Sequence, residues 1–168
     1  MTTTTLDATL ADAGAFRVWS VGGRHLTTAL AAVGQPSRTG AVTRGPLGET
    51  WGIAPDEVLL VTPAHATADP AAPLRAAGAL VTQIGAGLVH LRLSGPGALS
   101  VFESVCPVDL SDRALAAGSL AQASLAGMRA IIIREEGSVP AYRIVVQRDL
   151  AVSLRDALLH IGAREHQP

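Results

Sequence analysis

The pattern of hydrophobic and polar residues changes period within residues 87–110, and it predicts a strand followed directly by a helix. From Leu88 to Ser94 the side chains alternate in polarity, which is typical of a half-buried strand. Gly95-Pro96-Gly97 ends this strand, because glycine accepts positive φ and proline fixes φ. The helix is expected to end at Cys106, since a residue that precedes proline disfavours the α region. Its apolar residues share one helical face: Ala98, Val101, Phe102 and Val105.

The same reasoning predicts further strands along the chain. The three consecutive isoleucines of 130–134 indicate a strand, because β-branched residues favour extended backbone. A charged turn over 135–138 leads to its expected hairpin partner over 141–147, and a turn at 127–129 precedes it. The other expected strands lie at 15–21, 57–62, 81–84 and 119–126.

Helical spacing is found in four shorter segments. A helix over 6–13 would bury Leu6, Leu10 and Ala13, and another over 24–33 would stop at Gly34. A third is expected within 70–78. Ser111 is placed to cap a single turn that closes at Gly118.

The last helix is expected to begin after Asp149 as its cap and to end at Gly162. Its predicted apolar face consists of Val152, Leu154, Ala157, Leu158 and Ile161.

Together these elements predict an α+β fold, a single domain of mostly antiparallel strands with packed helices. Strands outnumber helices and the two do not alternate regularly, which argues against a doubly wound α/β sheet. We expect residues 1–14 to form a flexible N-terminal segment in which Thr2 to Thr5 fray. Residues 15–165 are expected to form one domain.

The amino-acid composition indicates which kinds of molecule this chain is expected to bind. Of the 168 residues, 48% are hydrophobic and only 3% are aromatic, and part of this apolar surface is expected to be covered by a partner chain. A net charge of −1 gives no field that attracts nucleic acid or an acidic membrane. The one cysteine excludes an internal disulfide framework and suits a reducing cytoplasm. The N-terminus lacks the features of a signal peptide, and no apolar run reaches the ~20 residues that span a bilayer.

No residue pattern indicates a metal or nucleotide site. The histidines do not occur in pairs with ligand spacing, and one cysteine cannot complete a zinc site: His25, His65, His90, His160 and His166. Gly85-Ala86-Gly87 precedes a strand, whereas a dinucleotide fingerprint follows one.

The remaining polar candidates are assigned structural roles. Cys106 lies at a helix C-terminus, which does not activate a thiol, and is expected to be a small buried side chain. Asp109 and Asp112 are expected to cap the turn around Ser111. Arg148 and Asp149 are read as a solvated ion pair or a partner contact.

Arg38 and Arg44 lie in residues 35–48, which are expected to form a loop or irregular hairpin. They are read as surface residues, with an anion or partner contact as the alternative.

Four segments in a fixed order resemble one known family. LSGPGA followed by CPVDL, between Leu93 and Leu110, resembles the core of the gamma subunit of heterotetrameric sarcosine oxidase. Three further segments resemble other parts of that subunit: Trp51–Leu60, Leu115–Gln122 and Tyr142–Leu154. The gamma subunit belongs to a superfamily of folate-binding domains that includes the glycine-cleavage aminomethyltransferase.

The resemblance implies a non-catalytic subunit. In the family, the complex oxidises an N-methyl amino acid and passes a one-carbon unit to tetrahydrofolate. FAD, FMN, NAD and tetrahydrofolate are then expected on the larger flavoprotein subunits, with zinc also elsewhere and no cofactor on this chain. Catalytic and metal-binding residues are expected to be absent here, and no residue is assigned to cofactor binding.

One departure from the superfamily supports this reading. Aminomethyltransferases carry acidic residues shortly after a glycine turn, and the matching residues here are 126–132. No acid occurs between Asp112 and Glu135, so a general base or a carboxylate that holds a pterin is missing. A stand-alone folate-binding or aminomethyltransferase-like protein and an unrelated small interaction domain remain alternatives.

Overall fold

The computed structural model describes residues 6–67 and 69–166, which form two compact units. The first unit contains the N-terminal residues up to Gly14 and everything from Leu88 onward, and the second contains residues 15–87. The expected fraying of Thr2 to Thr5 lies outside the described residues. None of the described helices is both long and apolar enough to cross a bilayer.

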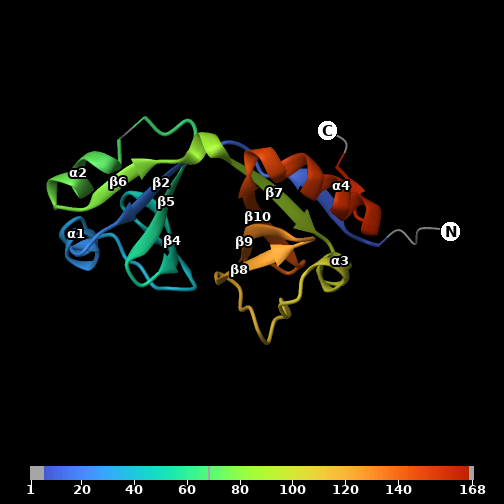
Figure 1. The fold of residues 1–168 in the computed structure, drawn as a ribbon. Coiled ribbons are helices and arrows are strands. Elements are labelled where there is room, and N and C mark those ends of the chain that lie inside the picture. The colour runs from blue at the N-terminus through green and yellow to red at the C-terminus, as the bar shows by residue number, and fades with distance from the viewer. Residues whose placement is uncertain (1–5, 68, 167–168) are drawn as a thin grey trace. The chain divides into compact units, whose positions relative to one another are not determined.

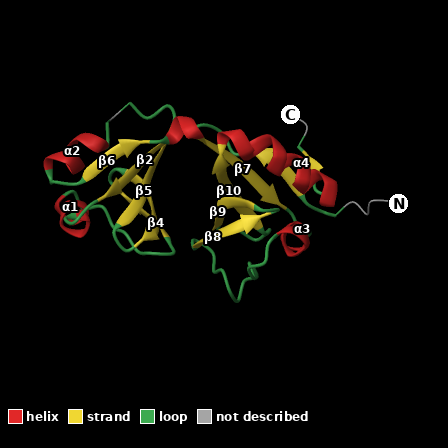
Figure 2. Ribbon diagram, in the orientation of Figure 1, coloured by secondary structure: helices red, strands yellow, loops and turns green. Residues whose placement is uncertain are grey.

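The first unit is built on a six-stranded sheet in the order β11-β1-β7-β10-β9-β8 (Figures 1 and 2). All of its pairings are antiparallel except that of β1 with β11. Its strands are β1 (Thr9–Asp12), β7 (Leu88–Ser94), β8 (Leu120–Leu125), β9 (Met128–Arg134), β10 (Ala141–Gln147) and β11 (Arg164–Glu165). Its helices are α3 (Ala98–Val105) and α4 (Ala151–Ile161), with a short 3-10 turn, η2 (Arg148–Leu150), before α4.

Both helices of this unit pack on the same face of the sheet and close its core. Phe102 and Val101 of α3 and Leu154 and Leu158 of α4 are fully buried there. The rings of Phe102 and Tyr142 meet edge to face, with their centroids 4.9 Å apart. The strand–helix corner that the sequence predicts over residues 88–105 is therefore confirmed.

The second unit is a five-stranded antiparallel sheet in the order β3-β4-β5-β2-β6. Its strands are β2 (Phe16–Gly22), β3 (Val42–Gly45), β4 (Gly48–Ala54), β5 (Glu57–Pro63) and β6 (Leu80–Gln83). Its helices are α1 (Leu26–Ala32) and α2 (Ala71–Ala76), and the turn η1 (Gly85–Gly87) leads out of the unit. Trp19, Leu60 and Leu74 are among the residues of its separate core.

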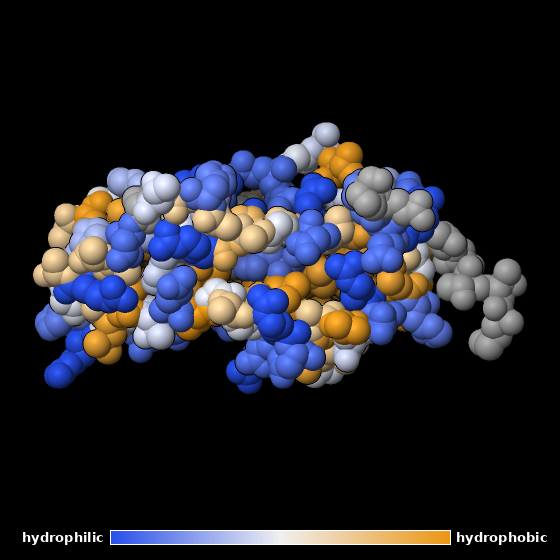
Figure 3. Space-filling model, turned by 90° about the horizontal axis from the view of Figure 1, so that it is seen from above, coloured by the Kyte–Doolittle hydropathy of each residue, from blue (hydrophilic) through white to orange (hydrophobic). Residues whose placement is uncertain are grey.

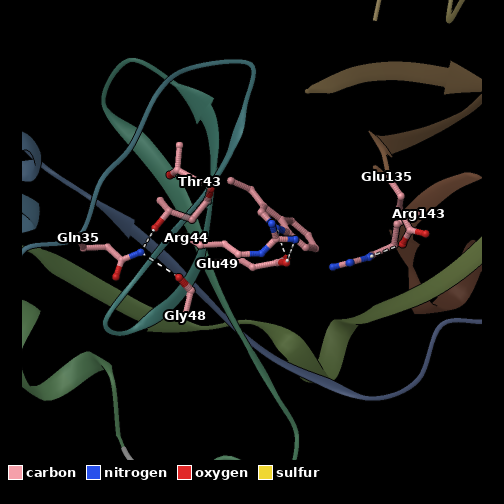
Figure 4. A network of polar contacts seen from close by, with 9 residues as sticks. Gln35, Thr43, Arg44, Gly48, Glu49, Glu135 and Arg143 are labelled. Carbon is pink, nitrogen blue, oxygen red and sulfur yellow. Dashed lines mark hydrogen bonds and ion pairs between the residues drawn. The ribbon is translucent and has the colours of Figure 1, made fainter. Parts of the chain in front are cut away.

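A buried glutamine fastens the β3–β4 hairpin of the second unit (Figure 4). The amide nitrogen of Gln35 donates to the carbonyl of Gly48 at 3.0 Å and to the hydroxyl of Thr50 at 2.6 Å. Its amide oxygen accepts from the backbone N–H of Leu47 at 3.0 Å. Because a buried amide without partners is costly, this arrangement fixes the path of residues 35–48. Of the two structures predicted for residues 35–48, a loop or an irregular hairpin, the hairpin is therefore the one observed.

Three local predictions are wrong. Residues 9–12 form β1 rather than part of a helix, because their backbone pairs with β7 and β11. Asp149 lies in η2 and does not cap α4, whose N-cap residue is Leu150 with no side-chain cap. Val152 does not belong to the apolar face of α4, because its side chain is 70% exposed.

The overall α+β class with mostly antiparallel strands is confirmed. Cooperative folding of residues 15–165 as one domain stays a prediction. The expected strand over 57–62 and the hairpin of 130–134 with 141–147 are confirmed as β5 and as β9 with β10.

Candidate functional site

The face of the six-stranded sheet that lies opposite α3 and α4 carries the candidate site, and we call it the helix-free face. Side chains alternate across a strand, so the neighbours of the core residues point to this face. The cross-strand register places Gln122, Ile131, Val145 and His90 in one row over β8, β9, β10 and β7. The adjacent row contains Ser124 opposite Arg129, and Gln147 opposite Leu88.

A pocket of about 410 Å³ lies over these two rows. Its polar lining consists of Gln122, Arg129 and Gln147, and its apolar lining includes Leu88, Ile131 and Val145. A second hollow of about 650 Å³ shares Gln122 and Arg129 and continues over Ser124 to the β8–β9 turn. An apolar floor with a few polar groups at its edge is the usual composition of a small-molecule site.

The lining of the pocket contains one formal charge, the guanidinium of Arg129. No acid lies between Asp112 and Glu135, so neither β8 nor β9 up to Ile133 offers a carboxylate. Arg129 can only donate hydrogen bonds, the amides of Gln122 and Gln147 can donate or accept them, and none of the three is a base at neutral pH. The arrangement is therefore suited to binding an acceptor group and not to proton abstraction.

A cluster of two arginines around one carboxylate lies at the other end of this face, and Figure 4 shows the contact of Glu135 with Arg143. Glu135 accepts from Nε of Arg92 at 2.7 Å and lies 3.5 Å from Nε of Arg143. Arg92 and Arg143 are directly opposite each other on β7 and β10. One carboxylate thus offsets part of the repulsion between two cross-strand cations, which would otherwise destabilise the pairing.

His90 is buried between these two groups of residues. The pKa of His90 is lowered from 6.5 to about 4, mainly by burial and secondly by the charge of Arg143, while the charge of Asp12 opposes the shift. The expected structural role of this histidine is consistent with a neutral imidazole in the native sheet.

The depressed pKa of His90 predicts a loss of stability in mild acid. Between pH 6.5 and 4 the unfolded chain binds a proton that the native His90 does not, so the contribution is complete above pH 6.5 and falls with pH. At about 1.4 kcal/mol per pH unit, the loss from pH 6.5 to 5 is about 2 kcal/mol. Urea unfolding at several pH values will measure it.

The matched comparison uses His90→Gln and His160→Gln, because His160 is exposed on α4. Only His90→Gln is expected to flatten the dependence of the unfolding free energy on pH. Equal slopes in the wild type and His90→Gln would contradict the role assigned to His90.

The structure does not bring the histidines together. Within residues 6–67 and 69–166, no group of three or more His, Cys, Asp and Glu side chains is placed to hold a metal ion. Gly85–Gly87 form η1 ahead of β7, and not a turn between a strand and a helix.

The other candidates have structural contacts. Cys106 ends α3 as a free, half-buried thiol that packs at the edge of the core, so it is less buried than expected. Asp109 accepts from the backbone N–H of Ser111 at 2.8 Å, and this bond lowers the pKa of its carboxyl. Asp112 pairs with Arg134. Ser111 starts a turn through its carbonyl, which accepts from Ala114 and Leu115, and no α-helix follows.

The structure gives contacts for two of the arginines that the sequence analysis placed on the surface. Arg148 donates to the carbonyl of Leu88 at 3.4 Å. Arg44 pairs with Glu49 at 3.2 Å and is mostly exposed, which is the surface role expected of it.

Residues 126–132, the segment in which the sequence comparison expected acids, divide between the β8–β9 turn, the core and the pocket lining. Ala126 and Gly127 form the β8–β9 turn with φ values of +47° and +83°. Ala130 and Ile132 are buried beneath α3 and α4. The apolar residues at these positions therefore complete the core.

The sequence analysis did not predict the pocket, although the alternation of polar residues in one strand indicates the face on which it lies. Polar residues at every second position of a strand, as at Gln122 and Ser124, mark a face that is not packed in the core. The pattern did not show which residues of β9 and β10 lie beside them.

Most of the large hydrophobic side chains of the described residues are buried in the two cores. The large hydrophobic side chains exposed in the described residues are Leu80, Val108, Val139 and Val152. Figure 3 shows polar and apolar residues interspersed over the face that it presents. An interface with another chain would therefore combine polar and apolar contacts.

Comparison with known proteins shows the fold. No family model matches the sequence, and no curated protein matches it. A chain of the heterotetrameric sarcosine oxidase from Corynebacterium sp. U-96, solved with pyrrole 2-carboxylate, is similar with a TM-score of 0.73 and 24% identity. The match covers 95% of this chain and 88% of that one.

The glycine cleavage system aminomethyltransferase T from Bartonella henselae is also similar, with a TM-score of 0.69 and 18% identity. This match covers 93% of the present chain and 46% of the aminomethyltransferase. The chain therefore has the fold that these two proteins share.

Proposed function

We propose that this chain is a non-catalytic gamma-type subunit of a multi-subunit, flavin-dependent sarcosine (N-methyl amino acid) oxidase. In this role it packs against the large subunit. The complex oxidatively demethylates its substrate and passes the one-carbon unit to tetrahydrofolate.

The extent of the structural match carries the proposal. The match with the sarcosine oxidase chain includes nearly the whole of both chains, so the two are similar in length. The aminomethyltransferase, in contrast, continues well beyond the matched part. A match over nearly the whole of a sarcosine oxidase chain therefore supports a subunit role more than a match over less than half of the aminomethyltransferase supports an enzymatic one.

The chemistry of the candidate site supports the absence of catalysis. The pocket lining offers polar and apolar contacts but no carboxylate, and residues 126–132 contain no acid. FAD, FMN, NAD and tetrahydrofolate are accordingly assigned to the partner subunits.

The proposed partner is a larger flavoprotein chain. The scattered exposed hydrophobics favour a mixed polar and apolar interface rather than one broad apolar patch. A stable interface of ordinary size buries about 1,200–2,000 Å² in total.

Affinity purification from the native host tests the subunit role. A tagged copy of the full chain is expected to recover larger subunits that co-elute in size-exclusion chromatography and show a flavin absorption band. The chain purified alone is expected to be colourless. Recovery of a free, monodisperse chain without a flavoprotein, under conditions that preserve other host complexes, would contradict the proposal.

A stand-alone folate-binding protein is the second candidate, and the similarity to aminomethyltransferase T favours it. Titration of the purified full chain with tetrahydrofolate under anaerobic conditions separates the two. Micromolar binding without a flavoprotein partner supports the second candidate. Recovery of the flavoprotein complex together with no binding by the free chain supports the first.

A further inference from the structure

We propose that the pocket on the helix-free face binds a small organic monocarboxylate. Its carboxylate is held by Arg129, and its apolar body lies on Ile131, beside the buried Val145. The proposal concerns the first unit alone and does not rest on the subunit role.

The strand register brings these groups together. Ile131 on β9 is directly opposite Val145 on β10 and Gln122 on β8, so the middle of this row is an apolar floor. Arg129 is two residues before Ile131 on the same strand and faces Ser124 across β8. Gln147 is two residues beyond Val145, so it extends the polar row on the other side of Arg129. A polar row thus lies beside an apolar one within a single pocket.

Arg129 differs from the other arginines of this sheet. Arg92 and Arg143 both contact Glu135, and Arg134 pairs with Asp112. Arg129 makes no ion pair or hydrogen bond with any of the described residues, and its side chain is exposed in the lining of the pocket. Its charge is therefore available to a ligand.

The donors fit a carboxylate better than other anions. A guanidinium presents two parallel N–H groups that match the two oxygens of a carboxylate. The amide of Gln147 and the hydroxyl of Ser124, on either side of Arg129, add neutral donors at the same level. A phosphate dianion would meet only one positive charge in this lining.

The rest of the pocket selects the body of the ligand. Ile131 and Leu88, which are partly exposed, offer aliphatic surface without charge, and the buried Val145 lies between their strands. A cavity of about 410 Å³ is at the small end of the range for ligand sites, which favours a compact apolar group. An aryl or branched alkyl carboxylate satisfies both requirements.

Calorimetric titration of the full chain with 2-naphthoate and with neutral 2-naphthamide tests the proposal. The two probes share one apolar body, so their difference reports the carboxylate contact. 2-Naphthoate is expected to bind and 2-naphthamide to bind at least about tenfold more weakly, the effect of one charge-assisted contact.

Two pocket variants and one matched control locate the site. Arg129→Gln is expected to weaken 2-naphthoate at least about tenfold and to change 2-naphthamide binding less than about twofold. Gln147→Glu, which is exposed and nearly isosteric, is expected to weaken 2-naphthoate by repulsion. Arg113→Gln removes an exposed arginine outside the pocket and is expected to have no effect.

Thermal unfolding followed by circular dichroism checks that each variant remains folded. The proposal is overturned if 2-naphthoate shows no binding at about 10 mM. A ligand of this size with ordinary ligand efficiency would bind more tightly than that concentration. The proposal is equally overturned if Arg113→Gln weakens binding as much as Arg129→Gln, or if both pocket variants bind 2-naphthoate as the wild type does.

Discussion

Replacement of Phe102 by alanine is expected to lower the free energy of unfolding by about 3–5 kcal/mol. Phe102 is 1% exposed in the centre of the first core and packs edge to face on Tyr142. Removing the ring leaves a cavity between α3 and the sheet, and it also removes the aromatic contact. Tyr142 is held in place by its hydroxyl, which donates to the carbonyl of Leu110 at 3.2 Å, so it is poorly able to fill the space.

Urea unfolding followed by circular dichroism will measure this loss. Glu103→Ala is the matched control, because Glu103 is the next residue of α3 and is exposed. Its effect is expected to stay within about 0.5 kcal/mol. A loss below about 1 kcal/mol for Phe102→Ala would show that this face of α3 is not packed as described.

Gly52→Ala is expected to lower the free energy of unfolding by about 3 kcal/mol. A Cβ atom at this position would lie 2.1 Å from the carbonyl oxygen of Arg38 and 2.8 Å from Cα of Thr39. Both are backbone atoms, so a side-chain rotation cannot relieve the clash. Gly52 also accepts from the N–H of Gly40 at 2.8 Å and donates to Ala41 at 3.1 Å, so separating the segments would break both bonds.

Gly87→Ala provides the control for the loss of glycine itself. Gly87 has no atom within 4 Å of an added Cβ, and its φ is not positive. Alanine there is expected to change stability by less than about 0.5 kcal/mol. Similar midpoints for Gly52→Ala and the wild type in urea would contradict the close backbone approach at Gly52.

Local sequence patterns predicted the elements whose own residues determine them. The alternation before Ser94, the glycines of the turn and the helical spacing of Val101 and Phe102 all act within a few residues. The same is true of the three isoleucines of β9 and of its hairpin with β10. In these elements the local preference and the tertiary packing favour the same structure, so the sequence alone is sufficient to predict them.

The prediction for residues 6–13 was wrong for the opposite reason. Leu6 and Leu10 have helical spacing, but Leu10 is paired with Leu93 and with Glu165, which are far away in the sequence. Pairing with two neighbouring strands outweighs a weak local preference for helix. No local pattern reports the positions of such partners.

The candidate site depended even more on long-range register. Arg129 is an ordinary surface arginine in the sequence, and its setting follows from Ser124 on one side and Gln147 on the other. Those neighbours come from two other strands of the sheet. The resemblance to a known family correctly indicated the fold, and it assigned no residue to this pocket.

The pairing of β1 with β7 and β11 has a consequence for synthesis on the ribosome. β1 is made first, but β7 follows only after the whole second unit, and β11 is made after all the other strands. The second unit has all of its strands available once residue 87 has emerged, so it can fold while β1 still waits for its neighbours. The side of the six-stranded sheet that carries β1 and β11 is therefore completed only after all the other strands have been made. Until that moment the nascent chain presents unpaired strand edges of the kind that chaperones protect.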